Sequence, residues 1–258
     1  MTAHITATHE IESAIHHLDT YGYCILTSRM PVDVAGEIAE RCLEMQDDPQ
    51  YQAYNSGNPN ESTTMSGMYN LDDKVWQFLT HPDVLAIAYH FLGSDCRVTE
   101  VCAKPIWPGS LGYGLHVDEA NFFHKVPNVP WLINTMWMLT DFTENNGATA
   151  VVPMSHKCHF KQQPTEIPFE SPLVKIATGQ PGSVLLWHGG TLHTATPNTG
   201  DGVRVGLNIA YHARWFNHYV NTHIEPIWAE TYVRMPPEMQ KLFTLRRGRT
   251  KSEIYEVG

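Results

Sequence analysis

Two histidines and an aspartate are spaced as the ligands of a metal ion would be. His116 and Asp118 are separated by one residue, and alternate side chains of an extended chain point to the same side. A second imidazole from another strand, that of His193, can complete a triangle with them. Two imidazoles and one carboxylate occupy one face of an octahedral metal and leave its other positions open, which suits non-haem Fe(II) and oxygen chemistry.

The His-x-Asp pattern occurs three times in a chain with 15 histidines, so the pattern by itself is weak. Residues 17–19 fall in a run typical of a helix, where positions two apart lie on different faces. Residues 81–83 contain a proline that is typical of a helix start. His116 and Asp118 instead lie where a glycine-rich run meets an extended segment. The alternative is that His116 and Asp118 are two ordinary polar residues with no ligand. The residues further along the chain, described next, argue against it.

The second histidine has a rival in His188, five residues before His193. In one extended strand these two side chains would face opposite sides, so both cannot bind the same ion from that strand. Gly189 and Gly190 separate His188 from the short strand that contains His193, which favours His193 as the ligand.

Arg204 follows His193 by eleven residues, beyond a predicted turn at 197–202. We expect this turn to return the chain as an adjacent strand and to place Arg204 in the same interior. An arginine inside a β core is costly unless it is paired, and its planar fork binds a carboxylate through two hydrogen bonds. An exposed arginine on an edge strand is the alternative.

The elements that must position these residues change in character at Arg97. From there, short runs typical of strands alternate with Gly, Pro and Asn, which predicts a sandwich or a barrel. The predicted strands cover residues 97–103, 132–139, 149–152, 174–177, 183–187, 192–195 and 203–211.

The preceding part predicts a helical layer, because apolar residues recur there at helical spacing. The predicted helices cover residues 9–20, 31–45, 74–79 and 82–92, with a short strand at 24–26. Residues 46–66 are polar and rich in Asn, Ser, Gly and Thr, so we expect a long loop there.

Length and composition favour a single domain over residues 1–258. We expect a helical layer at about 9–93, a β core at about 97–216 and a helix-rich tail at about 217–258. The hydrophobic content of 42% supports a sizeable core. The formal net charge of −10 argues against binding to nucleic acid, and we interpret the basic cluster at 246–251 as a solvated segment.

The five cysteines are scattered and form no Cys-x-x-Cys, which favours a reducing compartment. The first residues do not resemble a signal peptide, and no run is long and apolar enough to predict a membrane span. We therefore expect a cytoplasmic protein that does not bind membranes. The oligomeric state is left open.

Several further stretches resemble one known family. They are residues 19–23, 79–93, 139–149, 152–157 and 181–189, which precede His193 and Arg204. With these stretches, residues from about 10 to 216 resemble the phytanoyl-CoA dioxygenase family of Fe(II)/2-oxoglutarate-dependent oxygenases. The resemblance implies a mainly β fold with flanking helices, in which a double-stranded β-helix (a cupin-like jelly roll) packs against an N-terminal helical layer.

The resemblance also implies the roles of the site residues. Iron would be held by His116, Asp118 and His193, and Arg204 would bind the distal carboxylate of 2-oxoglutarate. Asn134 and Tyr113 would contact the cosubstrate. Three further residues could line the pocket, although a structural role suits them equally well: Lys104, Thr149 and Trp187.

Two positions depart from the family pattern. Met154 replaces the usual glycine of a turn, and Ala195 replaces a hydroxyl residue that some members use to bind the cosubstrate. The nearby His156 is interpreted as structural.

The implied activity is oxidation of an unactivated C–H bond of a small molecule in specialised metabolism. Oxygen would be consumed, and 2-oxoglutarate would give succinate and CO2. Asp118 favours hydroxylation over halogenation, with desaturation and ring formation left open, and substrate choice is expected to come from residues 46–66, 119–130 and the tail. The alternatives are a zinc-dependent hydrolase or isomerase and a catalytically silent binding protein on the same scaffold.

Overall fold

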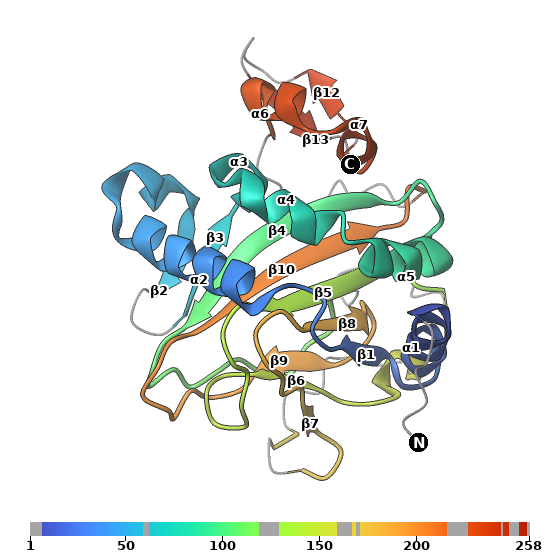
Figure 1. The fold of residues 1–258 in the computed structure, drawn as a ribbon. Coiled ribbons are helices and arrows are strands. Elements are labelled where there is room, and N and C mark those ends of the chain that lie inside the picture. Colours follow the sequence, from blue (N-terminus) through green and yellow to red (C-terminus); the bar gives the residue numbers. More distant parts are fainter. Residues whose placement is uncertain are drawn as a thin grey trace.

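The computed structural model describes residues 7–58, 62–118, 129–158, 167–168, 171–215, 227–243, 245–247 and 253–256. Across these ranges a large and a small antiparallel sheet make up the core, and helices cover one face of the large sheet (Figure 1). A group of short C-terminal elements packs beside α3.

The large sheet has seven strands in the order β1-β8-β5-β10-β4-β3-β2, and the small sheet has the order β7-β6-β9. Every pairing in both sheets is antiparallel. This arrangement confirms the expected jelly roll. The strands are β1 (Tyr23–Leu26), β2 (Asn55–Asn58), β3 (Ser62–Ser66), β4 (Arg97–Ile106), β5 (Leu132–Met138), β6 (Thr149–Val151), β7 (Lys175–Ile176), β8 (Val184–His188), β9 (His193–Ala195) and β10 (Arg204–His212).

The helices of the N-terminal part also lie close to their predicted positions. Pro82 begins α5 at a position where a missing N–H costs nothing, and Gly93, with φ of 93°, ends it. The helices are α1 (Ala7–Tyr21), α2 (Val32–Asp47), α3 (Met68–Leu71), α4 (Trp76–Leu79) and α5 (Pro82–Leu92), with 3-10 turns η1 (Pro49–Tyr54), η2 (Asp73–Val75) and η4 (Ser155–Lys157).

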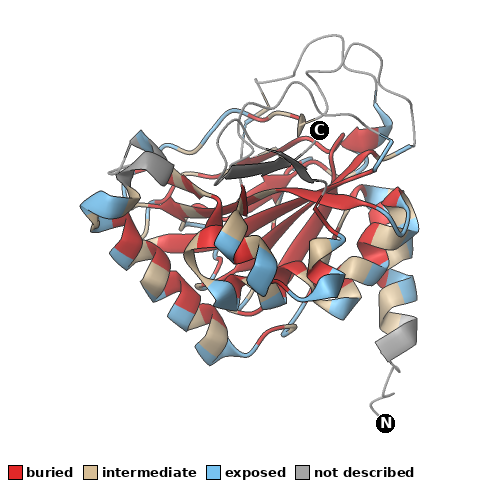
Figure 2. Cartoon of the chain, turned by 90° about the horizontal axis from the view of Figure 1, so that it is seen from above, coloured by how far each residue is buried: buried red, intermediate tan, exposed pale blue. Residues whose placement is uncertain are grey.

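Alternation along the strands separates the two faces of the large sheet. On β10, Val205, Leu207 and Ile209 join the core beneath the helices, whereas Arg204 and Asn208 face a cavity on the other side. The view in Figure 2 shows the buried strands behind helices whose outer faces are exposed.

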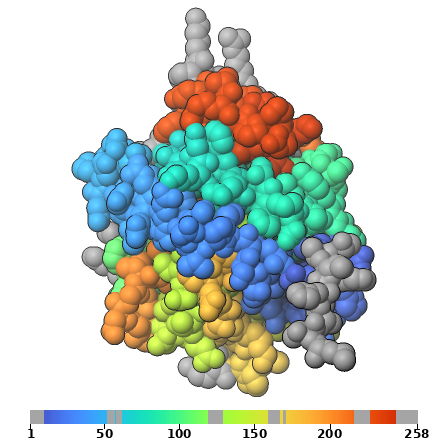
Figure 3. Space-filling view, viewed as in Figure 1, coloured from blue at the N-terminus to red at the C-terminus, as the bar shows by residue number. Residues whose placement is uncertain are grey.

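Packing of the helices on the sheet relies on large buried side chains. The ring of Phe78 on α4 meets that of Trp137 on β5 edge to face, with the ring centroids 5.1 Å apart. The Tyr211 hydroxyl on β10 donates to the Leu79 carbonyl at 2.8 Å. In space-filling view the helical segments form a continuous cover over this face (Figure 3).

The prediction of a long loop at residues 46–66 is wrong. The chain there completes α2, makes the turn η1 and adds the hairpin β2–β3 to the edge of β4. Asn, Ser, Gly and Thr are typical of turns, but here backbone pairing to an existing edge stabilises strands that have little apolar alternation. The hairpin brings Thr64 to the cavity.

The described residues of the C-terminal tail are only partly helical, which corrects the expectation of a helix-rich tail. The helices α6 (Ala229–Arg234) and α7 (Pro237–Gln240) accompany a small sheet of β11 (Ile227–Trp228), β12 (Leu245–Arg247) and β13 (Glu253–Glu256) in the order β11-β13-β12. The pairing of β11 with β13 joins segments far apart in sequence, so no local sequence pattern predicts it.

We expected the turn after β9 to return the chain as a neighbouring strand, and this expectation is wrong. β9 belongs to the small sheet, whereas β10 lies between β4 and β5 in the large one, so residues 197–202 cross from one sheet to the other. Asn198, which is fully buried, holds the crossing by donating to the carbonyls of Ile106 and Gly202, both at 2.9 Å. His193 and Arg204 therefore approach the same cavity from different sheets.

The helices within the described ranges are all too short or too polar to cross a membrane.

Candidate metal and cosubstrate site

His116, Asp118 and His193 lie together at the inner side of the small sheet. Their ligand atoms all fall within 4.8 Å of one another. Asp118 Oδ1 is 3.9 Å from His116 Nε2, and Asp118 Oδ2 is 3.4 Å from His193 Nε2. The structure thus brings together the three residues that the sequence singled out.

Both imidazoles are oriented by the backbone. His116 Nδ1 donates to the Gly114 carbonyl and His193 Nδ1 to the Thr191 carbonyl, each at 3.0 Å. A carbonyl can only accept, so in the neutral form of each ring the proton lies on Nδ1 and Nε2 is left to bind a metal. Burial lowers the pKa of His193, which favours this neutral form further. These are the tautomers that a metal requires.

The loop before His116 is aligned with β9 by direct hydrogen bonds. His116 and His193 exchange backbone N–H···O bonds of 3.0 and 2.9 Å, and Tyr113 N–H donates to the Ala195 carbonyl at 3.0 Å. Gly112 permits this approach, since a Cβ there would lie 2.4 Å from the Ala195 carbonyl oxygen. The two histidines are therefore facing neighbours across a strand pair.

Asn134 on β5 contacts the carboxylate of this group. Its Nδ2 donates to Asp118 Oδ2 at 2.5 Å, and its Oδ1 accepts from Asn208 Nδ2 at 3.4 Å. Asn134 was expected to contact the cosubstrate, and that role stays a prediction.

Arg204 is 1% exposed, yet its described partners are backbone carbonyls and a ring. Nε and Nη2 donate to the Gly147 carbonyl, Nη1 donates to the Lys104 carbonyl at 3.2 Å, and the guanidinium lies over the Phe142 ring at 4.6 Å. No carboxylate among the described residues pairs with it. Burial lowers the pKa of Arg204 to about 9, a cost that an incoming carboxylate would offset.

A second pair of charges lies on β4. Lys104 Nζ is 3.4 Å from Glu100 Oε1, and both side chains are about one third exposed to the cavity. Burial alone would lower the pKa of Lys104, but the charges of Glu100, Cys102 and Asp118 raise it above its ordinary value. Lys104 therefore remains a cation.

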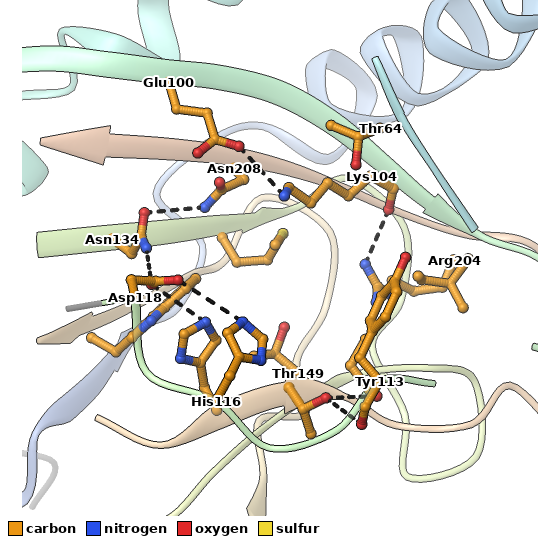
Figure 4. Close-up of a pocket in the computed structure, with 16 residues that line it drawn as sticks. Thr64, Glu100, Lys104, Tyr113, His116, Asp118, Asn134, Thr149, Arg204 and Asn208 are labelled. Carbon is orange, nitrogen blue, oxygen red and sulfur yellow. Dashed lines mark hydrogen bonds and ion pairs between the residues drawn. The ribbon is translucent and has the colours of Figure 1, made fainter. Parts of the chain in front are cut away.

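One cavity of about 340 Å³ joins all these groups. Figure 4 shows Arg204 and Tyr113 toward one side of it and Asp118, Asn134 and Asn208 toward the other. The lining residues are Thr64, Glu100, Lys104, Ile106, Tyr113, His116, Asp118, Asn134, Met136, Thr149, Trp187, His193, Thr194, Ala195, Arg204 and Asn208.

The other residues considered from the sequence separate into two groups. Lys104, Thr149, Trp187 and Tyr113 all line the cavity, and the Trp187 ring lies against His193 at a centroid distance of 4.9 Å. The Tyr113 hydroxyl makes a short hydrogen bond with Ser62 on β3.

His188 and His156 lie outside this cavity and face each other with ring centroids 5.2 Å apart. His188 Nδ1 accepts from the Gly190 N–H at 2.8 Å, and His156 Nε2 donates to the Asp19 carbonyl at 3.1 Å. Met154, the replaced turn glycine, adopts φ of 64°, so the turn keeps its left-handed conformation without glycine.

Six of the lining residues were not singled out from the sequence (Thr64, Glu100, Ile106, Met136, Thr194 and Asn208), and Glu100 and Asn208 are the two that contact the polar groups described above. Each of these two lies four positions from a residue that was singled out, Lys104 on β4 and Arg204 on β10. An even spacing on a strand places side chains on one face, so this rule would have found both. Thr64 gave no such signal, because its segment was expected to be a loop.

The donor set fits a divalent transition metal with open positions. Two imidazole nitrogens and one carboxylate oxygen suit Fe(II), and both imidazoles are already in the form that binds a metal. The guanidinium of Arg204, which pairs with no carboxylate in the described ranges, fits the far carboxylate of a diacid such as 2-oxoglutarate.

Curated relatives of this chain are fungal dioxygenases. The chain is 26% identical over 173 residues to dioxygenase af480 of Aspergillus fumigatus, an alignment that covers 66% of this chain and 52% of that protein. It is 32% identical to dioxygenase trt7 of Aspergillus terreus, covering 64% and 58%, and 30% identical to dioxygenase andF of Emericella variicolor, covering 73% and 65%. The chain therefore spans between half and two thirds of the length of these relatives.

Solved structures share the fold at low sequence identity. The α-ketoglutarate-dependent epimerase SnoN from nogalamycin biosynthesis has a TM-score of 0.64 at 17% identity, covering 79% of this chain and 83% of that one. HygX of Streptomyces hygroscopicus, solved with nickel, 2-oxoglutarate and hygromycin B, has a TM-score of 0.61 at 16% identity, covering 79% and 88%.

A family model described as phytanoyl-CoA dioxygenase (PhyH) matches residues 18–206. The match covers most of the chain and includes every proposed metal and cosubstrate ligand. The chain therefore belongs to the phytanoyl-CoA dioxygenase (PhyH) family.

Proposed function

We propose that this protein is an Fe(II)- and 2-oxoglutarate-dependent oxygenase that oxidises a C–H bond of a small molecule. The observation that carries the proposal is the shared cavity: a His/Asp/His set lines the same space as a buried guanidinium that pairs with no carboxylate of the described residues. The dioxygenase relatives and the α-ketoglutarate-dependent neighbours support it.

In this proposal the chain supplies binding and orientation. His116, Asp118 and His193 hold the iron, and Arg204 holds the distal carboxylate of 2-oxoglutarate so that its keto-acid end reaches the metal. The bound iron supplies the oxygen chemistry, in which O2, 2-oxoglutarate and the substrate C–H give succinate, CO2 and, for hydroxylation, an alcohol.

The charges of the cavity favour an uncharged substrate. Lys104 and Arg204 are cations, and Glu100 and Asp118 are carboxylates, so the charged side chains of the wall balance. A divalent metal and a dianionic cosubstrate add equal and opposite charges. We therefore propose a neutral small molecule whose hydroxyl or carbonyl group binds the Lys104–Glu100 pair. SnoN and HygX, whose structures contain nogalamycin RO and hygromycin B, show that related folds accept small molecules.

The metal role is tested without a substrate. Under anaerobic conditions Fe(II) and 2-oxoglutarate should give a visible charge-transfer band, and Asp118→Ala or His193→Ala should abolish it. His188→Gln is the matched control and should keep the band, because His188 lies outside the cavity. A parent protein that retains zinc and gives no band would favour the hydrolase alternative, and one that binds no metal would favour a silent scaffold.

The substrate class is tested by stimulation of succinate release. Matched uncharged, acidic and basic small molecules should differ, with the uncharged ones stimulating. For a substrate found in this way, Glu100→Gln and Lys104→Met should each lower kcat/KM by roughly 10- to 100-fold, the effect of one hydrogen bond to a charged group, and leave 2-oxoglutarate binding unchanged. Stimulation by the acids or amines alone would contradict the charge argument.

A further inference from the structure

We infer that Asn134 and Asn208 are positioning residues that orient the Asp118 carboxylate for metal binding. The inference rests on the metal role proposed above and assigns these two amides a task that neither the sequence nor the comparisons suggested. Both side chains are buried, at 6% and 4% exposed, and both project from the large sheet toward the small one.

The direction of the hydrogen bonds is set by a backbone group. The Thr135 carbonyl accepts from Asn208 Nδ2 at 2.8 Å, and a carbonyl can only accept, so the Asn208 amide cannot be turned around. The same Nδ2 then donates its second hydrogen to Asn134 Oδ1 at 3.4 Å. With its oxygen engaged, Asn134 must present its NH2 group to Asp118.

Asp118 receives this donor on one oxygen. The bond from Asn134 Nδ2 to Oδ2 is 2.5 Å long, so the amide donor is in direct hydrogen-bond contact with the carboxylate. Asp118 lies in none of the named strands, so no strand pairing of its own segment fixes its position. A series of hydrogen bonds therefore connects the carboxylate of Asp118 to the large sheet. It runs from the Thr135 carbonyl through Asn208 and Asn134 to Asp118. Outer hydrogen bonds of this kind fix the orientation of metal ligands.

The test uses Co(II) alone, followed by 2-oxoglutarate. Asn134→Asp keeps the shape but replaces the donor with an acceptor that repels Asp118, and Asn134→Leu removes the donor without adding charge. We expect each to raise the Co(II) Kd by about 10- to 100-fold, the usual effect of losing such a partner, with Asn134→Asp the larger. The Kd of 2-oxoglutarate for the metal-saturated protein should stay within about twofold of the parent value.

A matched control separates this effect from the general cost of a buried charge. Asn70→Asp makes the same substitution on α3, at a residue that is 5% exposed and lies outside the cavity. Its Co(II) Kd should equal that of the parent. The d–d absorption of bound Co(II), which reports the ligand geometry, should change in the Asn134 variants and not in Asn70→Asp.

Asn208→Leu supplies a second, more distant perturbation. It frees the Asn134 amide to turn, so the Co(II) Kd should rise by a smaller factor than in Asn134→Leu. This variant also decides the matter if the Asn134 variants do not fold, and a parent-like Co(II) Kd for it would then overturn the inference.

The remaining outcomes are distinct. If the Asn134 variants bind Co(II) like the parent but lose 2-oxoglutarate, Asn134 contacts the cosubstrate instead and the inference is wrong. Unchanged affinity for both would also overturn it. If the parent itself binds no Co(II), the proposed function fails first.

Discussion

At the scale of single residues, Arg204 is a buried cation whose charge is not neutralised by any carboxylate of the described residues. Its guanidinium is buried among two carbonyls and the Phe142 ring, and the described residues supply it with no carboxylate. A buried charge of this kind is unfavourable until a counter-ion arrives. The diacid cosubstrate is the counter-ion that the proposal provides.

The first prediction concerns Arg204. Arg204→Met removes two charge-assisted hydrogen bonds to the cosubstrate, each contributing about 1.5–3 kcal/mol, so the Kd of 2-oxoglutarate should rise by roughly 100-fold or more. Arg204→Lys keeps the charge but not the planar fork, and an intermediate Kd is expected. Titration of the anaerobic Fe(II) charge-transfer band measures both. The Kd of the metal should not change, and a 2-oxoglutarate Kd equal to that of the parent would remove Arg204 from the site.

At the scale of elements, the short loop from Trp107 to Asp118 decides whether the two histidines meet. The loop lies antiparallel to β9 and pairs with it through His116 and Tyr113. Gly109 and Gly112 both adopt positive φ, 88° and 73°, but they differ in their surroundings. A Cβ at Gly112 would meet the backbone of β9, whereas a Cβ at Gly109 would meet nothing within 4 Å.

This contrast gives the second prediction. Gly112→Ala should lower the free energy of unfolding by about 1–3 kcal/mol and weaken Co(II) binding, because the loop must move away from β9. Gly109→Ala carries the backbone strain alone, so it should lower stability but leave the Kd of the metal intact. Urea denaturation and Co(II) titration of the two variants make the comparison. Equal metal affinities in both would show that the close approach does not matter.

The third prediction concerns the contact between the large sheet and its helices. Tyr211 on β10 donates to the Leu79 carbonyl, and burial raises the pKa of its phenol well above the ordinary value. The unfolded chain therefore loses the Tyr211 proton first, and the stability contributed by the neutral phenol is lost as pH rises above about 10. Tyr211→Phe should cost about 0.5–1.5 kcal/mol at neutral pH and show a shallower loss above pH 10. Unfolding measured between pH 7 and 11 tests this, and parallel curves for parent and variant would count against it.

At the scale of the whole molecule, the proposed ligands join two sheets. His116, Asp118 and His193 belong to the small sheet and the loop beside it, whereas Arg204 belongs to the large sheet. Metal alone would contact the first group, and 2-oxoglutarate would connect the metal to the second. Ligand binding should therefore stabilise the contact between the sheets.

The fourth prediction follows from this arrangement. A metal at about 100 times its Kd should add about 2.7 kcal/mol to the free energy of unfolding, and 2-oxoglutarate should add a further increment when metal is present. Differential scanning calorimetry should show the Tm rising in two steps, and a chelator should reverse both. In Arg204→Met the second step should be lost. A single cooperative transition is also what the single-domain prediction requires, and two separate transitions would contradict it.

The sequence by itself determined the strands of the core and the identity of the metal-binding candidates. Both depend on local rules: side chains two apart in an extended run share one side, which predicted that His116 and Asp118 act together, and Gly189 and Gly190 separate His188 from the strand that contains His193. The predicted strand boundaries agree with β4 to β10 to within a few residues, because short apolar runs between turn residues are a local property.

Tertiary structure alone decided which segments lie against one another. The polar hairpin β2–β3 is a pair of strands because β4 offers it an edge, and residues 197–202 cross between sheets although the turn looks like a hairpin. The bonds among Asn208, Asn134 and Asp118 join three segments from 118 to 208. Such contacts depend on the packing of strands that are distant in sequence. The free energy of that packing depends on residues from several segments at once, so no single stretch of the sequence predicts it.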